Sequence, residues 1–218
     1  MPSDDLTIEP SADIVVEPIP GLPEDLPQGE EILWQGRPDT WALAREALNA
    51  NWILGYFAVL AVWRVLTVID VLPTSQALSA AVPFVALGVA VCALLVLMAF
   101  LQARSTYYTV TSARIAMRIG AALTLNINLP FSEISGAGLD LRKSGTGTIA
   151  FQTKTRTKLS YLVLWPHARP WRFARTEPAL RCIPDAQSVA ALIAEAADAR
   201  IHQPQVIRAV PSKSVAAE

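Results

Sequence analysis

The sequence predicts an α+β membrane protein, in which a two-helix transmembrane hairpin is followed by an antiparallel β-barrel or curved sheet that a C-terminal helix closes. Two apolar segments, residues 50–72 and 77–103, are long enough to cross a bilayer, which takes about 20 residues. Apolar and polar residues then alternate as they do in half-buried strands. A segment near the C-terminus has the apolar spacing of an amphipathic helix.

The chain of 218 residues is therefore expected to have six parts. They are an acidic disordered tail (1–28), a strand, turn and interfacial helix (29–49), two transmembrane helices (50–72 and 77–103), a β-rich cytoplasmic domain (104–202) and a second disordered tail (203–218). The first tail is predicted to be disordered because a segment rich in proline and acidic residues cannot bury enough apolar surface to fold.

Charge is distributed unevenly along the chain. The formal net charge is −1, yet the first 31 residues contain nine acids and no Lys or Arg. Residues 101–182 contain twelve bases and three acids, so that stretch carries 12 − 3 = +9. This asymmetry favours an anionic membrane surface or an acidic protein partner. No recognition motif predicts binding to nucleic acid.

The segment before the first span is expected to lie along the membrane surface. Trp34, Arg37 and Pro38 predict a strand and a turn, and Trp34 is a candidate to pair with the β-rich domain. Thr40 is predicted to cap the short helix that follows. Arg37 belongs to the basic residues that flank the spans, whereas the loop between the spans carries neither Lys nor Arg. The positive-inside rule therefore places both termini in the cytoplasm.

The first span contains Arg64, whose guanidinium stays charged. Ten Leu, Ile, Val or Phe residues in 52–69 contribute about −0.3 to −0.6 kcal/mol each, which outweighs the about +2.5 to +3.5 kcal/mol of a central arginine. In one interpretation Arg64 snorkels toward Asp70 or a lipid phosphate. In the other it contacts a helix of a partner protein inside the membrane. Small residues of the second span, such as Gly88 and Cys92, are spaced to let another helix approach.

The β-rich domain is predicted from local periodicity. Strands are expected within Tyr107–Gly120, Ala121–Pro130, Thr148–Thr155 and Leu159–Leu164. A break is expected at Ser112 and Ala113, and a turn before the third of these segments. The C-terminal helix is expected to begin after Asp185, with Val189 and Ile193 on its apolar side.

No catalytic residue, cofactor site or metal site is expected, because the motifs that usually carry such chemistry are missing from the sequence. The densest group of aromatic and basic residues consists of Trp165, Trp171, Arg169 and Arg172. It predicts either ordinary packing at an edge or a docking surface at the membrane–water boundary. His167 lies within the group and is either a packed residue or a ligand for a metal or a chlorophyll-type pigment.

Several sequence blocks resemble known families. EEILWQGRP, YYTVTSARIAMRIG, LPFSEI and GTGTIAF resemble the bacterial pleckstrin-homology-like (PH-like) module. LPQGEEILWQGRPD and WPHARPWRFARTEPALRCIPDA resemble the photosynthetic-complex assembly proteins of purple phototrophic bacteria, the PuhB family, and the resemblance extends from Leu26 to Arg200. It implies that residues 104–202 form a PH-like domain and that the chain is a non-enzymatic assembly factor of the bacterial inner (cytoplasmic or intracytoplasmic) membrane.

The resemblance also implies the partners, which are subunits of the reaction centre and its core antenna, together with a second copy of the chain as a homo-oligomer. The basic charge adds anionic lipid headgroups. The residues expected to contact partners are Arg64, Asp70, Trp34, Arg37, Trp165, His167, Arg169, Trp171 and Arg172. The alternative function is a lipid- or protein-binding PH-like membrane module that is unrelated to photosynthesis.

Overall fold

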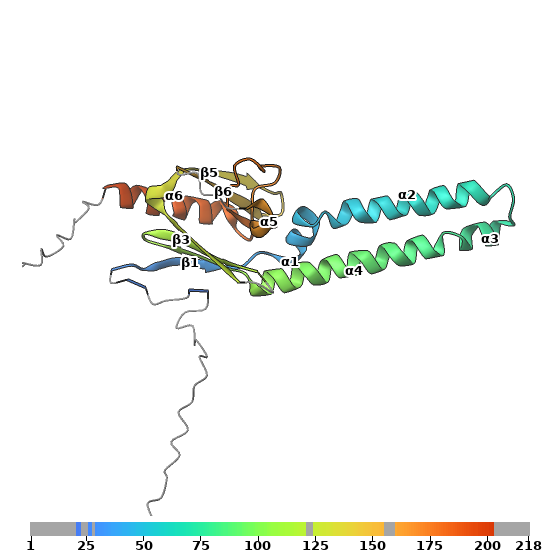
Figure 1. The fold of residues 1–218 in the computed structure, drawn as a ribbon, viewed down its shortest axis with the longest axis horizontal. Helices are drawn as coiled ribbons and strands as arrows, with labels where there is room; N and C mark the ends of the chain where they lie inside the picture. The colour runs from blue at the N-terminus through green and yellow to red at the C-terminus, as the bar shows by residue number, and fades with distance from the viewer. Residues whose placement is uncertain (1–20, 23–25, 28, 121–123, 155–159, 203–218) are drawn as a thin grey trace, which may run out of the picture.

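A computed structural model describes residues 21–22, 26–27, 29–120, 124–154 and 160–202. Its β-rich body lies at one end, and a helical hairpin projects from that body (Figure 1). The predicted tail 203–218 lies outside the described residues, as does the tail 1–28 except for residues 21–22 and 26–27.

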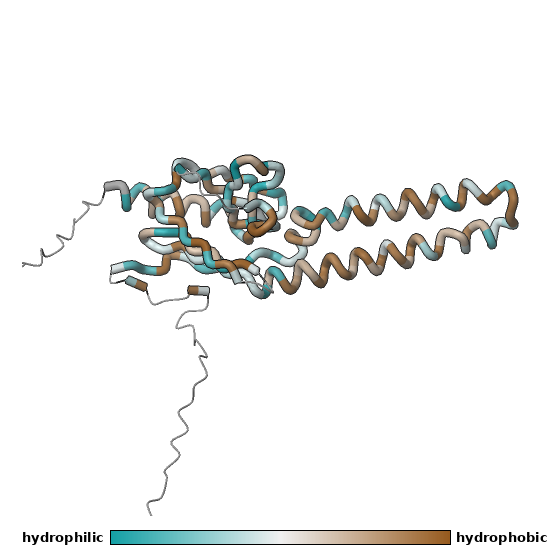
Figure 2. Tube along the Cα trace, viewed as in Figure 1, coloured by the Kyte–Doolittle hydropathy of each residue, from teal (hydrophilic) through white to brown (hydrophobic). Residues whose placement is uncertain are grey.

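The hairpin consists of α2 (Ala50–Val68), the short α3 (Thr74–Ser79) and α4 (Val82–Ser105). At about 1.5 Å per residue, α2 is about 28 Å long and α4 about 36 Å, close to the roughly 30 Å of a hydrocarbon core. Both helical segments are long and apolar enough to cross a membrane, and only 6% and 11% of their most apolar windows are buried within the chain. A core helix of a soluble protein would be mostly buried. Apolar residues run along the hairpin (Figure 2).

Small residues bring the two long helices together. A Cβ atom placed on Gly88 of α4 would lie 2.7 Å from Cβ of Phe57 in α2. The Cys92 thiol lies 3.9 Å from the Ala50 carbonyl oxygen. The expected approach of another helix to this stripe is therefore made by α2 of the same chain.

The first sheet has strand order β1-β2-β3-β4 and is antiparallel throughout. Its strands are β1 (Ile32–Gly36), β2 (Tyr107–Thr111), β3 (Arg114–Ile119) and β4 (Leu125–Pro130). Trp34 pairs with Val110, as the sequence suggested. Because β1 precedes the hairpin and β2 follows it, the hairpin is an insertion between two neighbouring strands.

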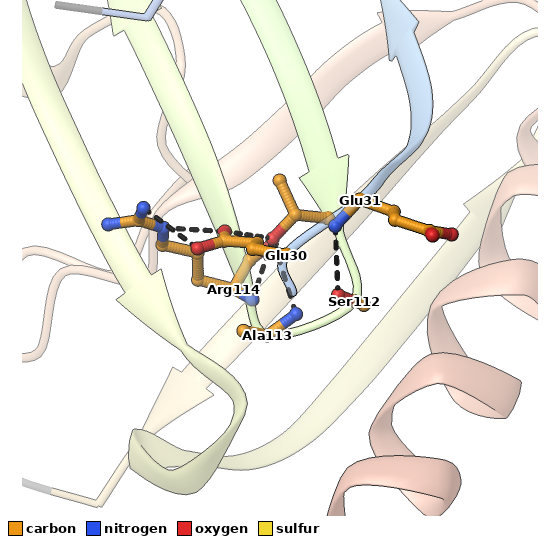
Figure 3. A network of polar contacts seen from close by, with 6 residues as sticks. Glu30, Glu31, Ser112, Ala113 and Arg114 are labelled. Atoms are coloured by element: carbon orange, nitrogen blue, oxygen red, sulfur yellow. Dashed lines mark hydrogen bonds and ion pairs between the residues drawn. The ribbon is translucent and has the colours of Figure 1, made fainter. Parts of the chain in front are cut away.

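The turn between β2 and β3 is tied to the start of β1 by Glu30 (Figure 3). The Glu30 carboxylate accepts hydrogen bonds from Arg114 Nε at 2.8 Å and Nη2 at 2.9 Å, and from the Thr111 hydroxyl at 2.6 Å. The next residue, Glu31, receives a hydrogen bond on its carbonyl oxygen from the Ser112 N–H at 3.0 Å. The break expected at Ser112 is thus a turn held by three charged and hydroxyl groups.

The second sheet has strand order β5-β6-β7 and is also antiparallel. After the short helix η2 (Phe131–Glu133) come β5 (Ile134–Leu141), β6 (Gly147–Thr153) and β7 (Ala179–Ile183). The final helix, α6 (Ala186–His202), contributes Val189 and Ile193 to a core shared with Met117 and Phe151 of the two sheets. The sequence predicted either a barrel or a curved sheet. The described strands form two separate sheets and no closed barrel.

Two local expectations were wrong. Residues Tyr161–Leu164, predicted as part of a strand, form the short helix α5, in which the Leu164 N–H donates to the Ser160 carbonyl at 3.1 Å. Asp39, and not Thr40, caps the short helix before α2, because its carboxylate accepts a hydrogen bond from the Ala42 N–H at 2.7 Å. This segment consists of α1 (Thr40–Ala42) and the π-helical turn η1 (Leu43–Ala47).

Candidate docking site beside the hairpin

Large apolar side chains project from α5 and the loop after it, which together we call the aromatic loop (residues 161–175). Its exposed members are Leu162, Val163, Trp165, Trp171 and Phe173. Leu162 is 85% exposed and Trp171 is 84% exposed, values that are unusual for residues of this size. Leu162, Val163 and Trp165 border the same cavity of about 520 Å³ as Gln102 near the end of α4. The aromatic loop therefore lies beside the base of the hairpin.

His167 holds the aromatic loop from inside the body. It is only 2% exposed, and its Nδ1 and Nε2 atoms lie 2.5 Å from the Tyr108 hydroxyl and 3.3 Å from the Thr106 hydroxyl. The Tyr108 hydroxyl accepts a hydrogen bond from the Arg181 backbone N–H at 3.3 Å. Its own proton is then donated to Nδ1, which places the one N–H proton of the neutral ring on Nε2, facing the Thr106 hydroxyl. His167 is thus a packed residue with both ring nitrogens engaged.

Burial keeps this pair of side chains neutral. Loss of hydration, with a smaller contribution from the charge of Arg181, lowers the pKa of His167 to about 3. Loss of hydration also raises the pKa of Tyr108 above its ordinary value. A neutral tyrosine can donate to a neutral imidazole, so the hydrogen bond persists across the physiological pH range.

The part of the aromatic loop around Ala168 and Arg169 is fixed to β7 and to the segment before it. Arg169 donates its backbone N–H to the Glu177 carbonyl at 2.9 Å, and its guanidinium lies 3.0 Å from the Glu177 carboxylate. Arg181 Nη1 donates to the Ala168 carbonyl at 3.0 Å. These contacts fix the backbone of this part of the loop, and Arg172, which lies between Trp171 and Phe173 in the sequence, is exposed.

The body joins the hairpin through the segment formed by α1 and η1. The Asp39 N–H donates to the Cys182 carbonyl at 2.7 Å, and Arg142 Nε lies 3.2 Å from the Glu46 carboxylate. Cys182 is fully buried in a cluster with Leu43, Ala44, Leu48, Ala99 and Ala103. Burial raises the pKa of the Cys182 thiol to about 12, which makes it a packing residue at this junction.

The remaining predicted contact residues lie elsewhere. Arg64 is exposed on α2, and among the described residues no ion pair joins it to Asp70, which lies just beyond the end of that helix. Trp34 packs against the main core. Arg37 places its guanidinium 4.0 Å from the centre of the Tyr107 ring and donates to the Tyr107 hydroxyl.

Trp165, His167, Arg169 and Trp171 therefore all lie on the aromatic loop, whereas Arg64 lies on α2. Sequence reasoning missed the partners that fix the aromatic loop, chiefly Tyr108 and Arg181. Both are single residues within strands, and no local sequence pattern marks them as neighbours of the aromatic loop. Tyr108, for example, lies about 60 residues before His167 in the sequence. Within the part of the chain that the structure describes, no three His, Cys, Asp or Glu side chains gather as a metal site requires.

Comparison with known proteins covers the hairpin and the body together. The profile of the family described as "Bacterial PH domain" matches residues 48–197. A relative from Rhodobacter capsulatus, named "Uncharacterized 23.7 kDa protein in puhA 5'region", is 47% identical over 199 residues, which cover 90% of this chain and 93% of the relative. No solved structure matches the chain.

Proposed function

The chain belongs to the bacterial PH domain family, and from this premise we propose that it is a non-enzymatic membrane assembly factor for the photosynthetic reaction centre and its core antenna. In this proposal α2 and α4 insert into the bacterial inner membrane, with both termini in the cytoplasm. The body lies on the cytoplasmic surface and holds a nascent membrane subunit there. Anionic lipid headgroups and a second copy of the chain are further proposed partners.

The observation that carries the proposal is the exposed aromatic loop beside the base of the hairpin. Trp171 and Phe173 contact each other, and Phe173 also contacts the Tyr161 ring, yet most of the surface of both rings stays exposed. Exposed aromatic side chains next to arginines are typical of binding hot spots and of membrane interfaces. A membrane subunit that contacts the hairpin within the bilayer would meet the aromatic loop where it leaves the bilayer.

The exposed position of Arg64 supports a second contact within the membrane. A charged group facing lipid is costly, and the exposed position leaves its guanidinium available to an acceptor on another helix or to a lipid phosphate. Each of these would reduce the cost. We assign the helix contact to the assembly function, and an Arg64→Leu substitution that left complex formation unchanged would contradict that assignment.

The photosynthetic context comes from two sources. The chain resembles the PuhB family in the blocks described above, and the printed name of the Rhodobacter capsulatus relative places that protein in the 5′ region of puhA. At 47% identity over nearly the whole of both chains, the two proteins are expected to share a role.

The test is affinity purification of the tagged chain in mild detergent from cells that are assembling photosynthetic complexes. Reaction-centre subunits should co-purify, and a Trp171→Ser/Phe173→Ser double substitution should raise the Kd for them by about 30-fold, the effect of losing roughly 2 kcal/mol at a hot spot, and so lower their yield. Leu141→Ser removes another exposed apolar side chain, outside the aromatic loop, and should leave the yield unchanged.

Deleting the gene provides an independent test in the cell. Reaction-centre levels should fall while pigment synthesis continues. Normal reaction-centre levels in the deletion strain would refute the proposed function.

A further inference from the structure

The strand β5 has one open edge. In the strand order β5-β6-β7 it pairs with β6 alone, and no described strand pairs with its other side. Its last five residues are all exposed. Proteins usually protect such an edge with Lys, Pro or a bulge, because bare backbone groups invite another strand to pair. β5 contains neither Lys nor Pro, its one register shift lies at its start, and Gly136 and Gly138 leave part of its backbone uncovered.

An apolar groove of about 380 Å³ lies between β5 and α6. Leu139 of β5 belongs to its wall and is 42% exposed. An open strand edge supplies main-chain hydrogen bonds to an added strand, and an adjoining groove receives alternate side chains of that strand. The two features together suit an extended peptide. Small and apolar residues form most of the lining, among them Ala137, Ile149, Phe151, Ile193 and Ala194.

The chain itself continues from the helix that forms one wall of this groove. α6 ends at His202, and 218 − 202 = 16 residues follow. Residues 205–210 have the sequence QVIRAV, in which three of six residues are β-branched. Pro204 and Pro211 flank this run. A short β-branched run between prolines is typical of a single strand.

The direction of α6 brings this run toward the groove. A Cβ atom on Gly147 would lie 2.7 Å from Cβ of Ala186, the first residue of α6, and Gly147 pairs with Leu141 at the end of β5. α6 therefore begins beside the C-terminal end of β5, and its last residue in the groove lining is Asp198. A chain that reverses after His202 runs back along the groove in the same direction as β5.

The length and charge of the run also match the groove. His202 lies about 6 Å beyond Asp198 at roughly 1.5 Å per helical residue. In an extended chain at about 3.3 Å per residue, residues 205–206 cover this distance and residues 207–210 span about 13 Å. The α6 wall, residues 190–198, is about 12 Å long. Asp198 is the only charged residue of the lining, and Arg208 is the only charged residue among 203–210.

We propose that residues 205–210 bind to the same chain as an added strand, which pairs with the open edge of β5 and places its apolar side chains in the groove. The added strand protects β5 from pairing with a strand of another molecule. This edge then accepts a foreign strand only after the C-terminal segment has left it. The inference does not depend on membrane insertion or on the proposed assembly role.

The test is hydrogen exchange of the purified protein in neutral detergent, compared between the full-length chain and a chain that ends at His202. The β5 amides that point away from β6 should exchange about 10-fold more slowly in the full-length chain, as expected when the docked state is about ten times more populated than the open state. The amides of β6, which pairs on both sides, should exchange equally in both proteins. A synthetic peptide of residues 203–213 should restore the slow exchange to the shortened chain, whereas a scrambled peptide should not.

Substitutions in the C-terminal segment test its role directly. Val206→Asp/Ile207→Asp places a charge on both faces of the added strand and should abolish the protection of β5. Val215→Asp/Ala216→Asp is the matched control, because it adds the same charges outside residues 205–210 and should keep the protection.

A substitution in the groove tests the receiving surface. Ala194 is exposed and lines the groove, so Ala194→Trp should fill it and remove the protection. Ala191 is exposed on the same helix but does not line the groove, so Ala191→Trp should leave the protection unchanged.

Equal exchange of β5 in the full-length and shortened chains would overturn the proposal. Full protection in both Val206→Asp/Ile207→Asp and Ala194→Trp would do the same. Protection that falls on dilution would also overturn it, because the groove would then be occupied by the C-terminal segment of a second copy. None of these outcomes depends on whether the chain assembles reaction centres, because only the purified protein is measured.

Discussion

Lowering the pH from 8 to 5 should destabilise the folded chain through His167. In the folded state its pKa is about 3 because the ring is buried. In the unfolded chain a histidine has a pKa of about 6.5. Between these two values only the unfolded chain takes up the proton, so the contribution of His167 is complete above about pH 6.5 and is lost as the pH falls.

The size of the effect follows from the two pKa values. Between pH 6.5 and pH 3 the free energy of unfolding changes by up to about 1.4 kcal/mol per pH unit for one such group. Integration from pH 8 to pH 5 gives a loss of about 2 kcal/mol. For a domain of this size, that loss lowers Tm by about 4–8 °C.

The assay is thermal unfolding of the purified chain in neutral detergent at pH 8 and pH 5, for the wild type and for His167→Gln. Other groups titrate in this range in both proteins, so the quantity of interest is the difference between the two pH dependences. His167→Gln should have the lower Tm at pH 8, because the hydrogen bond of the Tyr108 hydroxyl is disturbed, and it should lose less Tm on acidification. Equal losses in both proteins would refute a buried neutral His167.

Three further predictions concern packing, reactivity and ion pairing. Gly88→Ala should destabilise the hairpin by about 1–3 kcal/mol, since its Cβ would lie 2.7 Å from a carbon atom of α2, whereas Gly55→Ala meets nothing within 4 Å and should keep or raise Tm. In a Cys92→Ser background, the folded chain at pH 8 should resist labelling by a maleimide, because Cys182 is fully buried with a pKa raised to about 12; rapid labelling would contradict its position. Glu30→Gln should cost about 1–3 kcal/mol in the free energy of unfolding, because it removes the carboxylate of a partly buried bidentate pair; an unchanged Tm would count against that pair.

The elements that the sequence predicted well are those defined by local pattern. β3 and β4 were recognisable because inward and outward residues alternate along each strand. α6 was recognisable because its apolar residues recur at helical spacing. By contrast, LSYLVL was mistaken for a strand, because a short apolar run has no periodicity that separates a strand from a single turn of helix.

The candidate site was predictable in composition but not in geometry. The run WPHARPWR marks an aromatic and basic cluster, yet nothing in it indicates that His167 points inward while Trp171 points outward. That distinction is set by Tyr108, which lies on β2 and receives the ring of His167. Contacts between residues distant in sequence depend on how strands pair, and a single sequence carries little information about them.

The position of the hairpin in the chain explains how the aromatic loop is held relative to α2 and α4. Because the hairpin is inserted between the adjacent strands β1 and β2, both of its ends enter the same sheet (Figure 1). A single connection would let the body swivel, whereas two connections about one strand spacing apart resist rotation. The Asp39–Cys182 and Glu46–Arg142 contacts add the second sheet to this joint. In the function proposed above, a partner of the aromatic loop would therefore be held at a fixed position relative to α2 and α4, as a scaffold for a membrane subunit requires.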